Sequence, residues 1–248
     1  MNSLAPTRDP QAVLREVFGH ADFRGQQRDV VTHVVGGGDA VVLFPTGAGK
    51  SVCYQVPALC RPGVAIVVSP LIALMRDQVE ALRQAGVAAA AVNSTMTTEE
   101  YADVRRQLRS GELKLIYAAP ERVNLPGFAE MLRNVPISLI AIDEAHCVSQ
   151  WGHDFRPDYR ELSKLGEIFP GVPRLALTAT ADPHTRDDIV ERLGLTDARL
   201  FVSSFDRPNI SYTIVEKQSS RQQLLQFLKG HKGSSGIVYC LSRNKVDA

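Results

Sequence analysis

Short runs of apolar and β-branched residues recur along the 248-residue chain, and they constrain its fold more than any other feature. Most of them are apolar at consecutive positions rather than at alternate ones, which is typical of strands that are buried on both faces. The runs are Ala40–Phe44, Val64–Ser69, Ala88–Val92, Leu113–Ala118, Leu139–Ile142 and Arg174–Thr178.

Between these runs, apolar residues return every three or four positions, as in helices that pack on a core. Thr97 and Glu100 have the spacing of a capping box, Asp182-Pro183 offers an N-cap with a first-turn proline, and Gly194 suits a C-terminal cap. The helical segments are Ser51–Ala58, Ala73–Ala85, Thr98–Ser110 and Thr185–Leu193. The alternation predicts an α/β fold with a mainly parallel sheet flanked by helices.

Composition narrows the class of protein. Hydrophobic residues make up 44% and charged residues 22%, the balance of a soluble globular protein. No apolar run reaches the roughly 18 residues of a membrane span and no signal pattern opens the chain, so we expect a cytoplasmic protein without a membrane partner. The net charge of +1 means that any contact with a polyanion must be local.

The four cysteines are scattered and form no pair with metal-ligand spacing, so we expect buried thiols and no zinc site. They are Cys53, Cys60, Cys147 and Cys240.

The proline and asparagine of Phe205–Asn209 indicate a connector. We therefore expect one domain over residues 1–206. Residues 207–248 are too few for a second one, although Ile210–Val215 and Gly236–Cys240 are strand-like and Gln222–Lys229 is helix-like.

A candidate phosphate loop follows the first apolar run and opens a helical segment. Its residues are Pro45, Thr46, Gly47, Ala48, Gly49, Lys50 and Ser51. Glycines let backbone N–H groups curl round phosphate oxygens, Lys50 is placed to reach the terminal phosphates, and Ser51 to ligate Mg²⁺. Phe44 stands where the strict pattern has its first glycine, so a plain strand-to-helix turn is the alternative.

An acidic motif, Asp143-Glu144-Ala145-His146, follows another apolar strand directly. Hydrolysis of ATP needs a carboxylate that holds the metal and a second polar group that orients the attacking water. Asp143 and Glu144 fit these two roles. The sequence therefore predicts an ATP and Mg²⁺ site with Lys50, Asp143, Glu144 and His146 as its catalytic residues. A solvated acidic pair at a strand end is the alternative.

With this motif the chain resembles superfamily-two helicases, and within them the RecQ family, from Phe18 to Cys240. The resemblance implies a RecA-like P-loop domain followed by the truncated start of a second similar domain. It also implies an ATP-dependent 3′-to-5′ DNA helicase that unwinds DNA in recombination and repair. In such helicases Thr178 and Thr180 couple the nucleotide state to movement, whereas the bare sequence allows them simply to end a strand.

The segment Phe18–Gln27 resembles the adenine-recognising motif of the RecQ family. By position, Gln27 reads the adenine edge, because an amide offers a matching donor and acceptor. Arg24 flanks the base, and His20 occupies a place often held by an aromatic residue.

The segment Cys147–Pro157 resembles the aromatic-rich loop of RecQ helicases and holds the chain's only tryptophan. Trp151 and Phe155 offer stacking surfaces for unpaired bases, and Arg156 a contact to a phosphate or a ring. By the same resemblance, Gln150 and His153 are expected to couple DNA binding at this loop to the ATPase site. A core position is the alternative for Trp151, but its polar neighbours favour a binding loop.

Further matches to DNA-gripping motifs place Ser69 and Arg122 at the phosphate backbone, with Asn93-Ser94-Thr95 as a weaker candidate. The expected partners are single-stranded and partly duplex DNA. Because the later arginine motif is absent, we expect this chain to bind ATP with Mg²⁺ but to hydrolyse it poorly and not to unwind DNA. The alternatives are an RNA helicase of the Asp-Glu-Ala-His or Asp-Glu-Ala-Asp groups, and a non-catalytic nucleotide- and DNA-binding fragment.

Overall fold

The computed structural model describes residues 8–151, 154–180, 182–204, 210–240 and 242. The chain divides into two compact units, residues 1–205 and residues 206–248. Each unit is described by itself.

The first unit is built on a sheet in which the described residues form seven strands, and neighbouring strands are parallel throughout. The strand order is β3-β4-β2-β5-β6-β1-β7. The strands are β1 (Ala40–Leu43), β2 (Val64–Val68), β3 (Ala89–Val92), β4 (Leu115–Ala118), β5 (Ile137–Ile142), β6 (Arg174–Thr178) and β7 (Arg199–Val202). The first six correspond to the six apolar runs, so the predicted parallel α/β sheet is confirmed.

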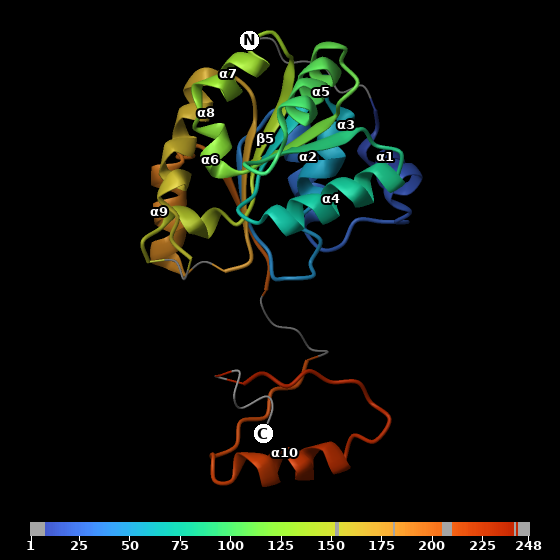
Figure 1. Cartoon of the computed structure of the whole chain (residues 1–248), viewed down its shortest axis with the longest axis vertical. Coiled ribbons are helices and arrows are strands. Elements are labelled where there is room, and N and C mark those ends of the chain that lie inside the picture. The colour runs from blue at the N-terminus through green and yellow to red at the C-terminus, as the bar shows by residue number, and fades with distance from the viewer. Residues whose placement is uncertain (1–7, 152–153, 181, 205–209, 241, 243–248) are drawn as a thin grey trace. The chain divides into compact units, whose positions relative to one another are not determined.

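Helices cover both faces of this sheet (Figure 1). One face is covered by α1 (Pro10–Phe18), α2 (Gln27–Val35), α3 (Val52–Cys60) and α4 (Ile72–Gln84). The other is covered by α5 (Thr98–Arg109), α6 (Pro120–Val123), α7 (Pro126–Leu132), α8 (Lys164–Ile168), α9 (Pro183–Arg192) and the 3₁₀ turns η1 (Ala145–Val148) and η2 (Pro157–Ser163). Strands β1, β2, β4 and β5 are consequently buried along their whole length.

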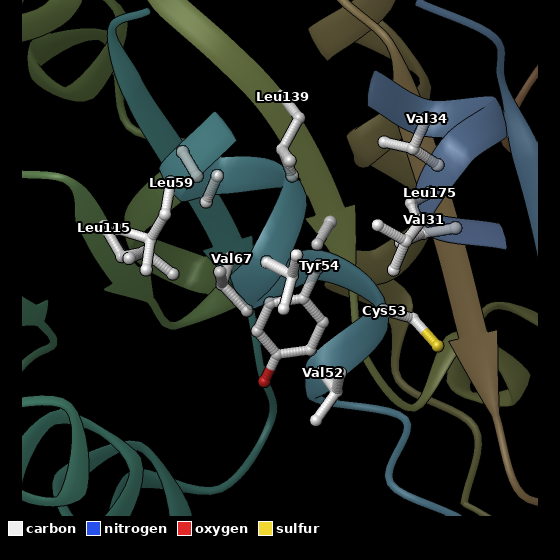
Figure 2. Close-up of a cluster of buried hydrophobic side chains, with 14 of the residues drawn as sticks. Val31, Val34, Val52, Cys53, Tyr54, Leu59, Val67, Leu115, Leu139 and Leu175 are labelled. Carbon is white, nitrogen blue, oxygen red and sulfur yellow. The ribbon is translucent and has the colours of Figure 1, made fainter. Parts of the chain in front are cut away.

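The core on the first face fixes the helix that follows the phosphate loop. Figure 2 shows side chains of α2 and α3 converging with Val67 and Leu139 of the sheet. Every residue of α3 is buried. This helix therefore cannot move without disturbing the sheet beneath it.

Local signals at the helix ends act as predicted. The Thr97 hydroxyl accepts from the Glu100 N–H while the Glu100 carboxylate accepts from the Thr97 N–H, which is a complete capping box. Asp182 caps α9, and Gly194 follows that helix with φ 62°. The predicted caps are confirmed.

One strand of the sheet was not predicted. We expected the segment from Phe201 to lead into a connector, but Arg199–Val202 forms β7 and pairs with β1. Only Phe201 of this edge strand is buried. The apolar run Leu200–Val202 is only three residues long and continues into the connector, so the sequence pattern did not mark it as a strand. Helices α1, α2, α6, α7 and α8 were also not predicted.

The second unit differs from the expectation. Among residues 210–240 and 242 the only regular element is α10 (Ser220–Lys229), and neither Ile210–Val215 nor Gly236–Cys240 is a strand. A strand needs a neighbouring strand for its backbone hydrogen bonds, and among the described residues neither run pairs with one. Cys240 is exposed, contrary to the prediction of buried thiols, whereas Cys53, Cys60 and Cys147 are buried. The predicted connector, residues 205–209, lies outside the described residues.

No helix in the described part of the chain combines the length and apolar character needed to cross a bilayer.

Candidate nucleotide and nucleic-acid site

Because the strands are parallel, their carboxyl ends meet at one edge of the sheet, where open α/β sheets bind their ligands. The predicted phosphate loop follows β1 and opens α3 at this edge. Gly47 and Gly49 have φ values of 82° and 75°, which disfavour residues with a Cβ. A Cβ at Gly49 would also lie 2.5 Å from Nε2 of Gln27. The loop conformation therefore depends on glycine at both positions.

Gln27 is buried and ties the phosphate loop to the start of α2. Its Nε2 donates to the carbonyls of Ala48 at 2.9 Å and Gly49 at 3.2 Å. Its Oε1 accepts from the Arg24 N–H at 2.8 Å. Both ends of the amide thus bind protein backbone in this structure, and its predicted contact with adenine stays a prediction. The side chains of Arg24 and His20 are exposed.

Lys50 is half-buried, and its Nζ donates to the carbonyl of Phe44 at 3.3 Å. It bends back over the loop to the residue that replaces the usual first glycine. Its positive charge partly offsets the rise that burial causes in the pKa of Asp143, which follows β5 at the same edge of the sheet. Lys50 and Asp143 therefore belong to one electrostatic site.

Asp143 carries a strongly perturbed carboxyl. Burial and the neighbouring charge of Glu144 raise its pKa to about 6. The hydrogen bond from the Glu144 N–H at 3.0 Å, Lys50 and His146 act in the opposite direction. Tyr159 donates from its hydroxyl to the Asp143 carbonyl at 2.9 Å and fixes the backbone there. A carboxylate that is desolvated and lies beside another acid favours a bound cation.

Glu144 has φ 48° and ψ 45°, and it is the only non-glycine residue with positive φ among the described residues. A left-handed conformation at such a residue costs about 1–2 kcal/mol. Strain of this kind persists where the surrounding structure over-determines it, typically at functional sites. Here it turns the chain sharply from β5 into η1.

His146 joins the acidic motif to the end of β6. Its Nδ1 lies 3.3 Å from Oε2 of Glu144 and 2.8 Å from Oγ1 of Thr178. The Thr178 hydroxyl donates to the Thr180 carbonyl at 3.1 Å and accepts from the Thr180 N–H at 3.2 Å. Since its single proton points to that carbonyl, the imidazole N–H is the donor to Thr178. The structure thus links Glu144, His146 and both threonines.

A hollow of about 270 Å³ gathers these segments. Its lining joins the phosphate loop, the end of β2, the acidic motif, the aromatic-rich segment and the residues after β6. The lining residues are Thr46, Pro70, Leu71, Glu144, His146, Asp154, Ala179 and Thr180. Thr46 and Thr180, which are far apart in the sequence, therefore line the same hollow.

The aromatic-rich segment presents its tryptophan to solvent. Trp151 is 76% exposed, which excludes the core position considered above. Its backbone N–H donates to the Ser149 hydroxyl at 3.1 Å, and that hydroxyl donates to the Asp188 carboxylate of α9 at 2.7 Å. Gln150 is exposed, and His153 lies outside the described residues. The base of the loop is thus anchored while the indole stays accessible.

Two neighbours of Trp151 have protein partners. The Arg156 guanidinium pairs with Asp154 at 2.9 Å and donates to the carbonyl of Pro70 at 3.0 Å. The partly buried Phe155 ring lies 5.0 Å from the Arg160 guanidinium. We expected Arg156 to meet DNA, but here its hydrogen bonds join the aromatic-rich segment to the end of β2.

The remaining predicted DNA contacts, Ser69, Asn93 and Arg122, lie on the segments that follow β2, β3 and β4. Ser69 is 2% exposed, and its hydroxyl has no hydrogen-bond partner among the described residues. The Arg122 guanidinium lies 5.2 Å from the Tyr101 ring. Asn93 is buried and accepts from the backbone and hydroxyl of Thr95. None of these side chains lines the 270 Å³ hollow.

The family model for DEAD/DEAH box helicases matches residues 24–189, which is more than half of the chain. The chain belongs to this helicase family. Within the family it is of the RecQ type. It is 50% identical over 235 residues to the ATP-dependent DNA helicase RecQ of Pasteurella multocida, covering 95% of this chain and 37% of the relative. It is 39% identical to the ATP-dependent DNA helicase RecQ of Bacillus subtilis, covering 96% of this chain and 40% of that protein.

This RecQ-type chain thus spans less than half the length of these curated relatives. Among solved structures it resembles the DUF1998 helicase MrfA, with a TM-score of 0.71 at 19% identity over 96% of this chain and 39% of that one. It also resembles a hypothetical ATP-dependent RNA helicase from Sulfolobus tokodaii, with a TM-score of 0.59 at 22% identity over 82% and 57% of the two chains. These likenesses confirm the RecA-like fold.

Several polar residues of this RecQ-type domain were not predicted from its sequence. They are Gln55, Tyr117, Tyr159 and Asp188. Each acts through a partner that is distant in sequence, such as Tyr117 for Gln55 and Ser149 for Asp188. No local motif marks them, so the sequence alone offers no signal.

Proposed function

We propose that this RecQ-type chain is the ATP-binding motor domain of a DNA helicase that moves 3′ to 5′ along one strand. One observation carries the proposal. The 270 Å³ hollow brings the phosphate loop, the acidic motif and Thr180 together. A nucleotide-driven motor needs such a place, where hydrolysis at one segment changes the position of another.

The residues at the head of α3 and the end of β5 fit ATP with Mg²⁺. The Ser51 hydroxyl and the Asp143 carboxylate are oxygen donors, which Mg²⁺ prefers. When bound, the ion neutralises charge on the phosphates. Lys50 releases the Phe44 carbonyl to reach the terminal phosphates, and Glu144 orients the attacking water.

A relay from Glu144 to Thr180 passes the nucleotide state to the end of β6. The His146 imidazole hydrogen-bonds Thr178, whose hydroxyl holds the backbone of Thr180 at both its N–H and its carbonyl. A shift of the Glu144 carboxylate on hydrolysis therefore alters the hydrogen bonds that position Thr180.

DNA is held by local contacts, because the net charge of +1 gives the chain no general attraction to a polyanion. Trp151 supplies an exposed stacking surface, which is worth about 1–3 kcal/mol per base. Arg156 fixes the loop to Pro70 and so keeps that surface close to the hollow. We also propose that the protein acts in the cytoplasm of a bacterium, at the nucleoid, where its DNA substrate would lie.

Competition between oligonucleotides tests this function. We expect a labelled single-stranded DNA to be displaced by unlabelled DNA at a lower concentration than by RNA of the same sequence. We also expect nucleotide with Mg²⁺ to change the DNA affinity, as measured by fluorescence anisotropy. Preferential displacement by RNA would instead support an RNA helicase, and absence of binding to either would contradict the proposal.

A further inference from the structure

A buried polar cluster joins α3, β4 and α4 behind the phosphate loop. It consists of Tyr54 and Gln55 on α3, Tyr117 on β4 and Gln78 on α4, and is called the Gln55 cluster below. Tyr54 and Tyr117 are each 1% exposed and Gln55 is 6% exposed. Figure 2 shows Tyr54 among the apolar side chains of the core. Polar groups at such a depth are kept only when they are paired.

The pairing uses both hydrogens of one amide. Nε2 of Gln55 donates to Oε1 of Gln78 at 3.0 Å and to the Tyr117 hydroxyl at 3.1 Å. The Tyr117 hydroxyl in turn donates to the Tyr54 hydroxyl at 3.4 Å. The two rings meet edge to face with centroids 6.3 Å apart. Gln55 is therefore the member that connects all three elements.

Each of these elements leads to a functional segment. Helix α3 begins directly after Ser51 of the phosphate loop. Strand β4 ends one residue after Tyr117 and runs into α6, which carries Arg122. Helix α4 begins directly after Leu71, which lines the hollow, and follows Pro70, to which Arg156 is bonded. The Gln55 cluster thus lies where the nucleotide-binding helix meets the two segments next to the proposed DNA site.

The hydroxyls of the cluster lie within electrostatic reach of the acidic motif. The charge of Asp143 contributes to raising the pKa of both Tyr54 and Tyr117, after the larger effect of burial. A displacement of α3 against β4 would leave a buried amide hydrogen or hydroxyl unpaired, which is unfavourable at this depth. The three elements therefore move together rather than sliding past one another.

We propose that Gln55 is a positioning residue which, through Tyr117 and Gln78, couples nucleotide binding at the phosphate loop to the affinity of the domain for single-stranded DNA. This inference rests on the proposed function. Coupling between two sites typically changes affinity by roughly 5–150-fold. Gln55 touches neither ligand, so its removal changes that factor and leaves the separate affinities in place.

The test compares four variants of the 248-residue chain. Anisotropy of labelled oligo-dT is measured with and without Mg²⁺ and a non-hydrolysable ATP analogue, and the ratio of the two dissociation constants is the coupling factor. Gln55→Leu and Tyr117→Phe should each bring this factor to within about 2-fold of one. Arg61→Lys is the matched control, because it weakens hydrogen bonds at the opposite end of α3.

The triple variant Tyr54→Phe, Gln55→Leu and Tyr117→Phe separates coupling from folding. Replacing all three buried partners by apolar groups of similar shape is nearly neutral for stability, and the half-buried Gln78 can bond water instead. Its melting temperature should therefore return towards that of the unmodified chain while its coupling stays lost. Recovery of coupling together with stability would overturn the inference, since the role would then be structural.

The outcomes distinguish this inference from the proposed function. If the unmodified chain binds neither ligand, the proposed function fails and the inference fails with it. If it binds both, but without coupling or with a coupling factor that Gln55→Leu leaves unchanged, only the inference is overturned.

Discussion

The two ends of one parallel sheet are built differently. At the amino ends of the strands, charges are paired or fully hydrogen-bonded. Asp39 before β1 holds Arg174 at the start of β6 through contacts of 2.7 and 3.0 Å. Arg61 is 6% exposed and donates to the carbonyls of Ser138 and Val35. The hydrogen bonds here join strands and helices to one another.

At the carboxyl ends the chain keeps unfavourable features. Asp143 has a pKa raised to about 6, Glu144 is left-handed, and Trp151 is 76% exposed. Each of these features costs stability unless a ligand offsets it. One end of the sheet stabilises the domain and the other is the end that we propose binds ligands, so substitutions at each end should separate these effects.

The largest effect on stability is expected at the amino ends. Arg61→Met should lower the free energy of unfolding by about 3–4 kcal/mol, because two buried carbonyls lose their donors. Nucleotide affinity of the folded protein should stay within about 2-fold, since Arg61 lies away from the hollow. Urea denaturation and a nucleotide titration measure the two quantities. Arg105→Met, at an exposed position on α5, is the control and should change neither. Loss of nucleotide affinity in Arg61→Met would contradict the separation of stability and ligand binding between the two ends of the sheet.

The next largest effect is a gain in stability, which we expect from a substitution of Asp143. The pKa of Asp143 is about 6 when folded and about 3.8 ordinarily, so between these values the folded state binds more protons. This carboxyl therefore lowers the stability of the protein as pH rises from about 3.8 to about 6, by about 3 kcal/mol in full. Asp143→Asn should raise the unfolding free energy at pH 7.5 by about 2–3 kcal/mol, while the gain disappears near pH 3.5. Denaturation at both pH values checks this, and a gain that does not depend on pH would refute the electrostatic cause.

The smallest effect on stability belongs to the exposed tryptophan. Trp151→Ala should weaken binding of single-stranded DNA by about 2 kcal/mol, or roughly 30-fold, through loss of stacking. The melting temperature should hardly change, because the indole is mostly solvated. Leu125→Ala removes another exposed apolar side chain and should leave DNA binding unaltered. Anisotropy titrations measure the DNA affinity of both variants. Tight DNA binding by the Trp151 variant would show that this loop is not part of the DNA site.

Local and long-range interactions also differ in how well the sequence predicts them. Strands β1 to β6 were predictable because burial on both faces requires continuous apolar runs, and the caps at Thr97 and Asp182 were predictable because their partners lie three residues away. The phosphate loop and acidic motif were recognisable because their chemistry is compressed into a few consecutive residues.

Contacts between distant segments could not be predicted in this way. Arg156 bonds the carbonyl of Pro70, which is 86 residues away, and Gln55 bonds Tyr117, which is 62 away. Gln27 has a side chain suited to adenine, yet its amide binds the Ala48 and Gly49 carbonyls. Which of several possible partners a polar side chain takes depends on the packed fold, and a local pattern does not contain that information.

The central claim is that the carboxyl ends of the strands form a site for ATP with Mg²⁺. Calorimetric titration of Mg²⁺ and ATP at pH 7.5 into the unmodified chain, Lys50→Ala and the exposed control Lys114→Ala tests it most directly. We predict one site in the unmodified chain and in the control, and an affinity roughly 10–150-fold lower for Lys50→Ala, since a charge-assisted contact is worth about 1.5–3 kcal/mol. Equal affinity of Lys50→Ala and the unmodified chain would contradict the account.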